Sequence, residues 1–270
     1  MPLPASFLRA GFVERAEITK TRRLMIGCDG PPDSGKSEFA MSAPSPSMHI
    51  VLDRGIDGAL HNPNPPKSRR PDIGFKVVQV PKATQMTQPQ YVEYWKKFYN
   101  EAYLVALNTP ECRTVVIDGD TDSWELQRLA EFGRLSKVPS NLYDNVNAAR
   151  RAMYSRAYDS GKIVIATNRT RKEYVTKTKA DGTPELNSSG NEVRIWSGEY
   201  ERQGFSDQEF LWTVQLRHYF NEETQQWGIR IMKCKPDRRL IGMTLEGEDC
   251  CFAGLVQTVY PHIPLREWGL

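Results

Sequence analysis

The sequence predicts an α/β protein in which a mostly parallel β-sheet is flanked by helices and followed by C-terminal β-hairpins. Over the first two thirds of the chain, short apolar and β-branched runs alternate with helix-like patterns. Parallel strands need long crossover connections, usually helices, so this alternation favours a parallel sheet covered on both faces. A glycine-rich sequence, GPPDSGKS at residues 30–37, stands between the first apolar run and a helix start.

Three strands are expected in the first eighty residues. Residues 24–28 (LMIGC) form a short apolar run that ends at the glycine-rich loop. The helix after the loop is expected over residues 35–42, because Pro44 and Pro46 stop it. Residues 48–52 and 75–80 are the next strand candidates.

The middle of the chain alternates helix and strand. Residues 114–117 (TVVI) predict a buried strand leading into Asp118, with Asp122 as the cap of the following helix. Residues 162–167 (KIVIAT) predict another buried strand that ends in polar residues. Helix spacing marks two helices, whose core faces carry Tyr91, Trp95, Phe98, Ala102 and Val105 in the first and Val146, Ala149, Met153 and Ala157 in the second.

The C-terminal third predicts two hairpins. Residues 174–178 and 193–196 flank one polar stretch, and residues 210–220 and 227–233 flank another. We expect residues 1–23 to be an N-terminal extension and residues 24–270 to be one domain, with a hairpin insertion at 169–200.

Composition excludes several classes of protein. The chain of 270 residues has 39% hydrophobic residues and no apolar run near the length that spans a bilayer, so we expect no membrane partner. The N-terminus lacks a secretory pattern, and the five cysteines form no CxxC pair, which favours a reducing cytoplasm. The net charge of +3 is too small to indicate nucleic-acid binding by itself.

The loop at residues 30–37 matches the phosphate-binding (Walker A) pattern. Gly30 and Gly35 would allow a tight turn whose amides face phosphate oxygens. Lys36 would reach the terminal phosphates, and Ser37 would give its hydroxyl to Mg²⁺. The remaining expected nucleotide contacts are Pro31, Pro32, Asp33, Ser34 and Glu38.

Asp118 is the candidate for the second half of this site. An acidic residue that ends a β-branched strand can hold Mg²⁺ or its water, as the Walker B aspartate does, although it can also simply cap a turn. Asp120 is a weaker candidate behind it.

Further polar residues follow other strands. Thr167 and Asn168 could present polar groups to the γ-phosphate or to the attacking water, because ligands gather at the carboxyl edge of such sheets. Asp53 follows residues 48–52 and could position water. For all three residues a plain turn role stays open.

The order of five sequences resembles that of phage-encoded RecA-like P-loop ATPases, especially the group associated with single-strand annealing and recombination. The sequences are GPPDSGKS, VLDRG, TVVIDGDTDSW, VIATNRTRKEY and IRIMKCK. The resemblance covers roughly residue 24 to the C-terminus. It implies a RecA-like P-loop NTPase core, ATP and Mg²⁺ as cofactors, side-by-side homo-oligomers as rings or filaments, single-stranded DNA as a partner, and a host cytoplasm.

The resemblance also implies roles for basic residues. Asn168 would couple nucleotide state to Arg169, Arg171 and Lys172, which are the candidate DNA contacts, and Tyr174 could stack on a base. A solvated hairpin rim is the alternative. Lys67, Arg69 and Arg70 are expected to be a solvated loop.

Lys233 and Lys235 are spaced by two along an expected strand and would emerge on one face. The resemblance implies that such a pair stabilises the γ-phosphate of a neighbouring subunit, as arginine fingers do. Alternatively, both lysines line the wet face of a hairpin.

Two departures from the family pattern concern catalysis. Asp33 stands where a glycine is common, and Gly55 stands two residues after Asp53, where a glutamate is common. The leading hypothesis is therefore an ATP-binding and hydrolysing protein acting on single-stranded DNA. A nucleotide-binding assembly protein with little turnover and a small-molecule kinase are the alternatives.

Overall fold

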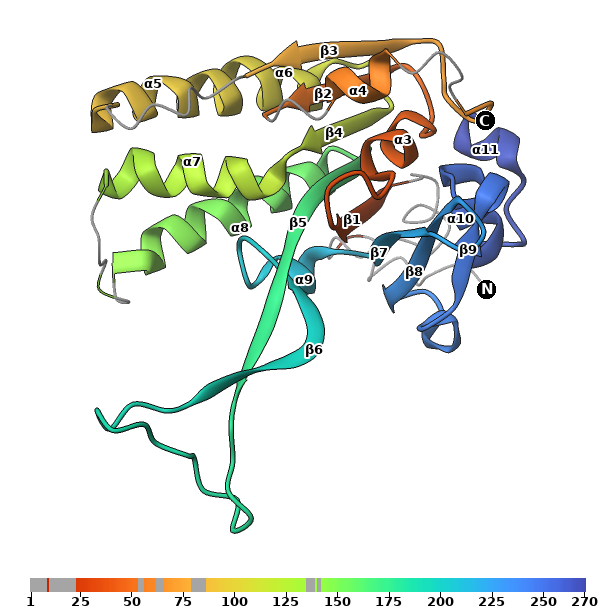
Figure 1. Cartoon of the computed structure of the whole chain (residues 1–270). Helices are drawn as coiled ribbons and strands as arrows, with labels where there is room; N and C mark the ends of the chain where they lie inside the picture. The colour runs from red at the N-terminus through yellow and green to blue at the C-terminus, as the bar shows by residue number, and fades with distance from the viewer. Residues whose placement is uncertain are drawn as a thin grey trace.

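The computed structural model describes residue 9 and residues 23–52, 56–61, 66–78, 86–134, 139 and 142–270. These residues form a nine-stranded sheet in the order β3-β2-β4-β5-β1-β7-β8-β9, with β6 paired to β5 outside that row (Figure 1). The row from β3 to β7 is parallel, and the pairs β7–β8 and β8–β9 are antiparallel. The predicted fold class, a mostly parallel sheet flanked by helices with C-terminal hairpins, is confirmed.

The parallel strands bring their carboxyl ends to one edge. They are β1 (Leu24–Gly30), β2 (Ser47–Val51), β3 (Ile73–Val77), β4 (Thr114–Asp118) and β5 (Ile163–Thr176). Because β5 lies between β1 and β4, the end of β1 at Gly30 and the end of β4 at Asp118 flank the middle of β5. Residues that follow these strands therefore share one edge of the sheet.

Helices cover both faces of the sheet. The first six, in chain order, are α3 (Lys36–Met41), α4 (Ile56–Leu60), α5 (Gln88–Phe98), α6 (Leu104–Asn108), α7 (Asp120–Phe132) and α8 (Tyr143–Asp159). Three short ones follow, α9 (Gln208–Leu211), α10 (Phe252–Val259) and α11 (Leu265–Trp268). Gly119, rather than the predicted Asp122, occupies the cap position of α7.

Two hydrophobic clusters hold these layers together. Met25 of β1 packs with residues of α5 to α8, including Tyr103 and Met153. Its neighbours Leu24 and Ile26 face the opposite cluster, which contains residues of α3, α10 and α11. The alternation along β1 is the period of a strand that is buried on both faces.

One predicted helix face is interrupted. Tyr91, Phe98 and Ala102 are buried as expected, but Val105 is 51% exposed. A π-helical segment, Tyr99–Tyr103, lies between α5 and α6. The wider π turn shifts the helical phase, so the core positions after it no longer follow the earlier spacing.

The strand predicted at residues 162–167 is much longer than expected. β5 continues through Asn168 to Thr176 and pairs with β6 (Arg194–Arg202) as an antiparallel hairpin. This hairpin projects away from the body of the molecule (Figure 1). The sequence expectation that Thr167 and Asn168 end the strand is therefore wrong.

The second hairpin extends the sheet beyond β1. It consists of β7 (Val214–Asn221) and β8 (Gln226–Cys234), and β9 (Thr244–Glu246) follows as the edge strand. The strand predicted from residue 210 begins later, because Gln208–Leu211 is the short helix α9. Among the described residues, no helix has the length and apolar character needed to cross a bilayer.

Candidate nucleotide site

The glycine-rich loop connects the end of β1 to the start of α3. Asp33 adopts a left-handed backbone conformation with φ of 59°, and Gly35 follows with φ of 85°. A Cβ at Gly35 would lie 3.0 Å from Trp227 Cγ, so glycine is required there for space as well as for backbone angle. The left-handed angle is one that Asp tolerates better than most residues, which explains how this chain departs from glycine at position 33.

Lys36 folds back over the loop. Its Nζ donates to the carbonyl oxygen of Gly30 at 3.1 Å and to Ser34 Oγ at 3.3 Å. Burial, together with the charge of Lys36, lowers the pKa of the neighbouring His218 to about 3. His218 is therefore neutral at physiological pH, and Lys36 provides positive charge at the loop.

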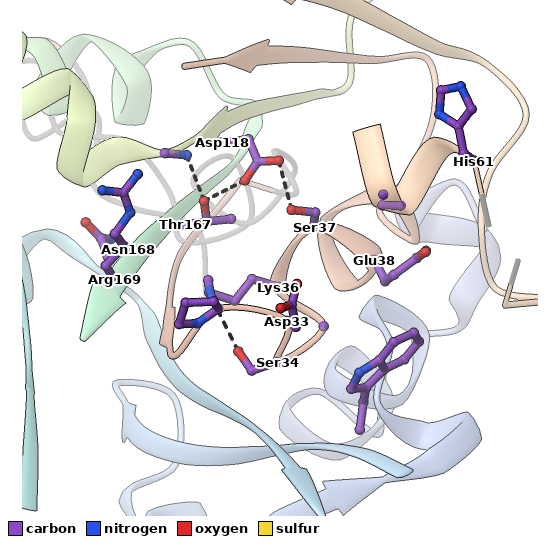
Figure 2. A pocket seen from close by; sticks show the side chains of 16 residues that line it. Asp33, Ser34, Lys36, Ser37, Glu38, His61, Asp118, Thr167, Asn168 and Arg169 are labelled. Carbon is purple, nitrogen blue, oxygen red and sulfur yellow. Dashed lines mark hydrogen bonds between the residues drawn. The ribbon is translucent and has the colours of Figure 1, made fainter. Parts of the chain in front are cut away.

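Ser37 and Asp118, the two residues predicted to hold magnesium, lie together. Ser37 Oγ donates to Asp118 Oδ2 at 2.9 Å (Figure 2). Thr167 Oγ1 donates to Asp118 Oδ1 at 2.7 Å and accepts from the Gly119 amide at 2.8 Å. The Asp118 carboxylate is 3% exposed, so these hydroxyl groups fix its orientation.

This donor set fits Mg²⁺. The ion prefers oxygen ligands and is commonly held by one or two protein groups together with water and substrate phosphates. Ser37 and Asp118 provide a hydroxyl and a carboxylate at such a position. Among the described residues, no group of three or more His, Cys, Asp or Glu side chains offers a metal site made by the protein alone.

The loop and strand ends surround a cavity of about 550 Å³. Asp118, Thr167, Asn168 and Arg169 line it on one side of the loop, and Glu38 and His61 lie on the other (Figure 2). Residues of the loop from Pro32 to Glu38 line the cavity, whereas Gly30 and Pro31, which were expected to contact the nucleotide, do not. The sequence did not indicate two of the lining side chains, His61 and Trp227.

Asn168 has unusual chemistry for a buried residue. It is 1% exposed, and neither its Oδ1 nor its Nδ2 has a hydrogen-bond partner among the described residues. Buried amides are rarely left unpaired, because desolvation without a partner is costly. Asn168 lines the cavity, although both of its polar atoms are themselves buried.

No family model matches this chain, and no curated protein matches it in sequence. Among solved structures, one described as "Crystal structure of the RadB recombinase" is similar over 83% of this chain and 86% of that chain, with 10% sequence identity and a TM-score of 0.41. At this TM-score and identity the similarity is loose.

Glu38 points to a different partner from the one expected. Arg69 Nε donates to Glu38 Oε2 at 3.3 Å, and Arg69 Nη2 pairs with Glu38 Oε1 and donates to the Ala59 carbonyl at 2.8 Å. The two side chains are 17% and 9% exposed. Arg69 therefore joins α3 to α4, and the prediction of a solvated loop is wrong for this residue.

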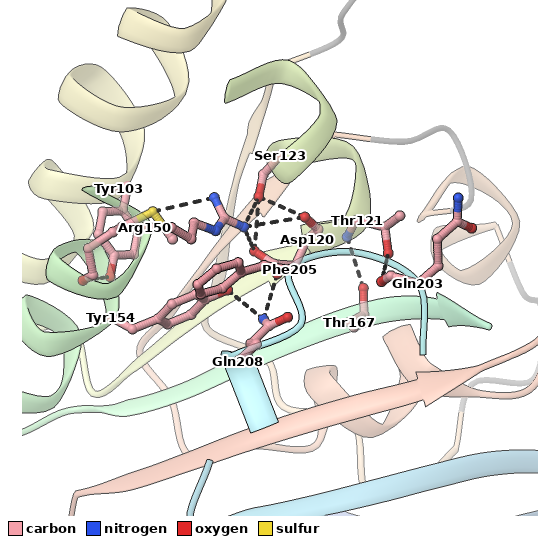
Figure 3. A network of polar contacts seen from close by, with 12 residues as sticks. Tyr103, Asp120, Thr121, Ser123, Arg150, Tyr154, Thr167, Gln203, Phe205 and Gln208 are labelled. Atoms are coloured by element: carbon pink, nitrogen blue, oxygen red, sulfur yellow. Dashed lines mark hydrogen bonds and ion pairs between the residues drawn. The ribbon is translucent and has the colours of Figure 1, made fainter. Parts of the chain in front are cut away.

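Asp120 faces away from the magnesium position. Its Oδ1 accepts from Arg150 at 2.5 Å, and its Oδ2 accepts from Gln208 at 2.6 Å (Figure 3). Gln208 also donates to Tyr154 Oη at 2.6 Å. Because these buried groups occupy both oxygens of Asp120, the residue anchors α7, α8 and α9 to one another and does not support the metal ligands as predicted.

The base of the β5–β6 hairpin is tied to the site from two directions. On one side, the Arg169 amide donates to Thr121 Oγ1 at 3.0 Å, and the Arg169 carbonyl accepts from the Gln203 amide at 2.8 Å. On the other side, Arg217 donates to Asp29 Oδ1 at 2.7 Å and to the Tyr200 carbonyl at 2.9 Å. Asp29 directly precedes Gly30, so the hairpin base contacts the elements that carry Asp118 and the loop.

The three candidate DNA contacts do not share one face. Arg169 pairs with Asp122 at 2.7 Å, and Arg171 pairs with Glu201 at 2.8 Å. Lys172 follows Arg171 along β5 and therefore points to the opposite face of the hairpin. Its Nζ lies 4.9 Å from the centre of the Trp196 ring.

Lys172 belongs to an exposed aromatic and basic face. Tyr174 pairs with Trp196 across the hairpin, and Lys172 pairs with Tyr200. The rings of Tyr174, Trp196 and Tyr200 are 45%, 47% and 47% exposed. We call this set, Lys172, Tyr174, Trp196 and Tyr200, the aromatic–basic face.

Lys233 and Lys235 both reach the end of α9. Lys233 Nζ donates to the Glu209 carbonyl, and Lys235 Nζ donates to the Phe210 carbonyl at 3.0 Å. They emerge on the same side, as their spacing predicts, and neither lines the cavity of its own chain. Lys235 lies just beyond β8, which ends at Cys234.

Asp53, the predicted water-positioning residue, lies outside the described residues, as do Arg54 and Gly55. The same holds for most of the expected N-terminal extension.

Proposed function

We propose that this chain is a RecA-like ATPase that binds and hydrolyses Mg-ATP and acts on single-stranded DNA in recombination, annealing or repair. The observation that carries the proposal is the Ser37–Asp118 hydrogen bond beside Lys36 in a cavity at the strand ends. A lysine, a hydroxyl group and a carboxylate in this order along the chain are the groups that P-loop proteins use for a magnesium nucleotide.

Each residue has a distinct task in this proposal. The loop amides and Lys36 bind the phosphates, Ser37 and Asp118 hold the metal, and Asn168 orients the attacking water or a terminal phosphate oxygen. Thr167 keeps the Asp118 carboxylate turned toward Ser37. Bound Mg²⁺ would supply positive charge that neutralises the phosphate oxygens.

The aromatic–basic face supports the proposal of a single-stranded DNA partner. Exposed rings stack on bases of any sequence, and a cation beside them contacts the backbone phosphates. β5 carries Asn168 and Arg169 at the cavity and Lys172 and Tyr174 on this face. One β-strand, β5, thus connects the proposed nucleotide site to the proposed DNA contacts.

Homo-oligomers remain part of the proposal. In a ring or filament, Lys233 and Lys235 would leave the α9 carbonyls and reach the γ-phosphate in the neighbouring subunit. Their present hydrogen bonds are to neutral carbonyls, which a charged phosphate outcompetes.

A nucleotide-binding assembly protein with little turnover is the second candidate. The observation that favours it is the state of two carboxylates that line the cavity: Glu38 is paired with Arg69, and Asp118 is fixed by two hydroxyl groups. Neither of these two is free to act as a general base.

The test compares the wild-type protein with Lys36→Ala and with Lys67→Ala, an exposed lysine outside the cavity. ATP turnover is measured with and without single-stranded DNA, and binding of single-stranded DNA is measured with and without ATP. We expect Lys36→Ala alone to lose nucleotide binding and turnover. DNA binding absent in every nucleotide state would refute the recombination proposal, and nucleotide binding without turnover would favour the assembly protein.

A further inference from the structure

The cavity has one end that the phosphate chemistry leaves unused. Lys36, Ser37 and Asp118 define where the terminal phosphates and the metal would lie. The rest of a nucleotide would extend along the remaining lining of the cavity. That lining includes Glu38 and His61 (Figure 2), and also Trp227.

Trp227 is held in place by the loop itself. It is the second residue of β8, directly after the turn from β7, and it pairs with Phe220 across the hairpin. Because β7 runs parallel to β1, this turn lies at the same sheet edge as the loop. The indole ring packs against Gly35, where even a Cβ would be 3.0 Å from its Cγ.

No hydrophobic core accounts for this ring. Trp212 and Trp268 belong to the two large clusters that cover the sheet, whereas Trp227 belongs to none of the clusters formed by the described residues. It is partly exposed and lines a cavity whose lining also includes charged and polar side chains. A flat ligand that stacks on the ring accounts better for a large apolar side chain in this position than core packing does.

We propose that Trp227 is the stacking surface for the base of the bound nucleotide. The inference rests on the proposed nucleotide binding and adds the residue that recognises the nucleoside. Stacking on an indole does not require base-specific hydrogen bonds. It favours purines over pyrimidines, because the larger purine ring covers more of the indole. Trp227 therefore raises the affinity for a nucleotide and leaves the affinity for a polyphosphate without a base unchanged.

The test measures the affinity of the full chain for two probes by calorimetry in the presence of Mg²⁺: a non-hydrolysable ATP analogue and inorganic tripolyphosphate. Trp227→Ala should weaken the ATP analogue roughly tenfold, because stacking contributes on this scale. The same variant should change the tripolyphosphate affinity by less than about twofold, since the loop and Lys36 are intact. Trp227→Phe should keep most of the ATP affinity.

Phe220→Ala provides the matched control, because Phe220 is the cross-strand neighbour of Trp227, is 42% exposed and does not line the cavity. It should leave both affinities unchanged. Equal losses for both probes in Trp227→Ala would overturn the proposal and make the ring a support for the loop. A wild-type protein that binds both probes equally would overturn it while leaving phosphate binding intact, and one that binds neither would overturn the proposed function as well.

Discussion

Replacing Arg150 by Met should destabilise the fold by about 3–5 kcal/mol at pH 7. Arg150 and Asp120 are 0% and 1% exposed, so the variant leaves a buried carboxylate without its cation. Asp120 keeps its hydrogen bonds from Ser123 and Gln208, but these partners are neutral. Urea unfolding followed by tryptophan fluorescence measures this loss of stability.

The adjacent Arg151 provides the control. It pairs with Asp207 on the surface, where the two side chains are 47% and 39% exposed, so Arg151→Met should cost less than about 1 kcal/mol. The double variant Asp120→Asn/Arg150→Met removes the orphaned charge and should recover much of the loss. A single Arg150→Met variant as stable as Arg151→Met would refute this reasoning.

Three further outcomes are expected. Asp118→Asn should raise the Mg²⁺ concentration needed for half-maximal nucleotide binding by roughly 10- to 100-fold, and an unchanged magnesium titration would contradict the metal role. Trp196→Ala should weaken single-stranded DNA binding by roughly tenfold in fluorescence anisotropy, whereas Ile195→Ala, on the other face of the hairpin, should not; equal effects would rule out stacking on the aromatic–basic face. Burial lowers the pKa of His49 and of His218 to about 3, with the charge of Lys36 contributing at His218. The unfolded histidines bind protons near pH 6.5, so stability should fall by up to about 1.4 kcal/mol per histidine and pH unit as the pH drops from 6.5 toward 3, and a double His→Gln variant should flatten that slope.

Local patterns were sufficient for β1, for β4 and for the phosphate loop. Residues 24–28 and 114–117 are apolar or β-branched because both faces of a parallel strand are buried, so these strands could be predicted from the local sequence. Gly35 and Lys36 could be placed because the loop is contiguous in the chain. Asp118 could be placed near Ser37 because strands of a parallel sheet end at one edge.

Contacts between residues that lie far apart in the chain could not be predicted from local patterns. Arg69 and Glu38 are 31 positions apart, and nothing in either segment indicates that the two side chains meet. Trp227 approaches Gly35 only because β7 lies next to β1 in the sheet. Val105 is exposed because a π turn adds a residue to the helix, and that insertion has no spacing of its own in the sequence.

The sequence analysis did not predict that β5 continues beyond Thr167 into the charged segment, for a different reason. An exposed two-stranded hairpin buries neither face in a core, so Arg169 to Lys172 need no apolar alternation and look like a loop.

The continuity of β5 has a mechanical consequence. The strand is paired within the parallel sheet up to Arg169 and pairs with β6 from Thr170 onward, so the outer part would act as a lever whose fulcrum is at Arg169. From Arg169 to Thr176 the arm is about 23 Å long at 3.3 Å per residue, and a tilt of about 5° at the fulcrum would move its end by about 2 Å. Thr121 and Arg217 hold the hairpin at its base. A force applied at the aromatic rings would therefore be transmitted to α7 and to β1, the strand that leads into Gly30.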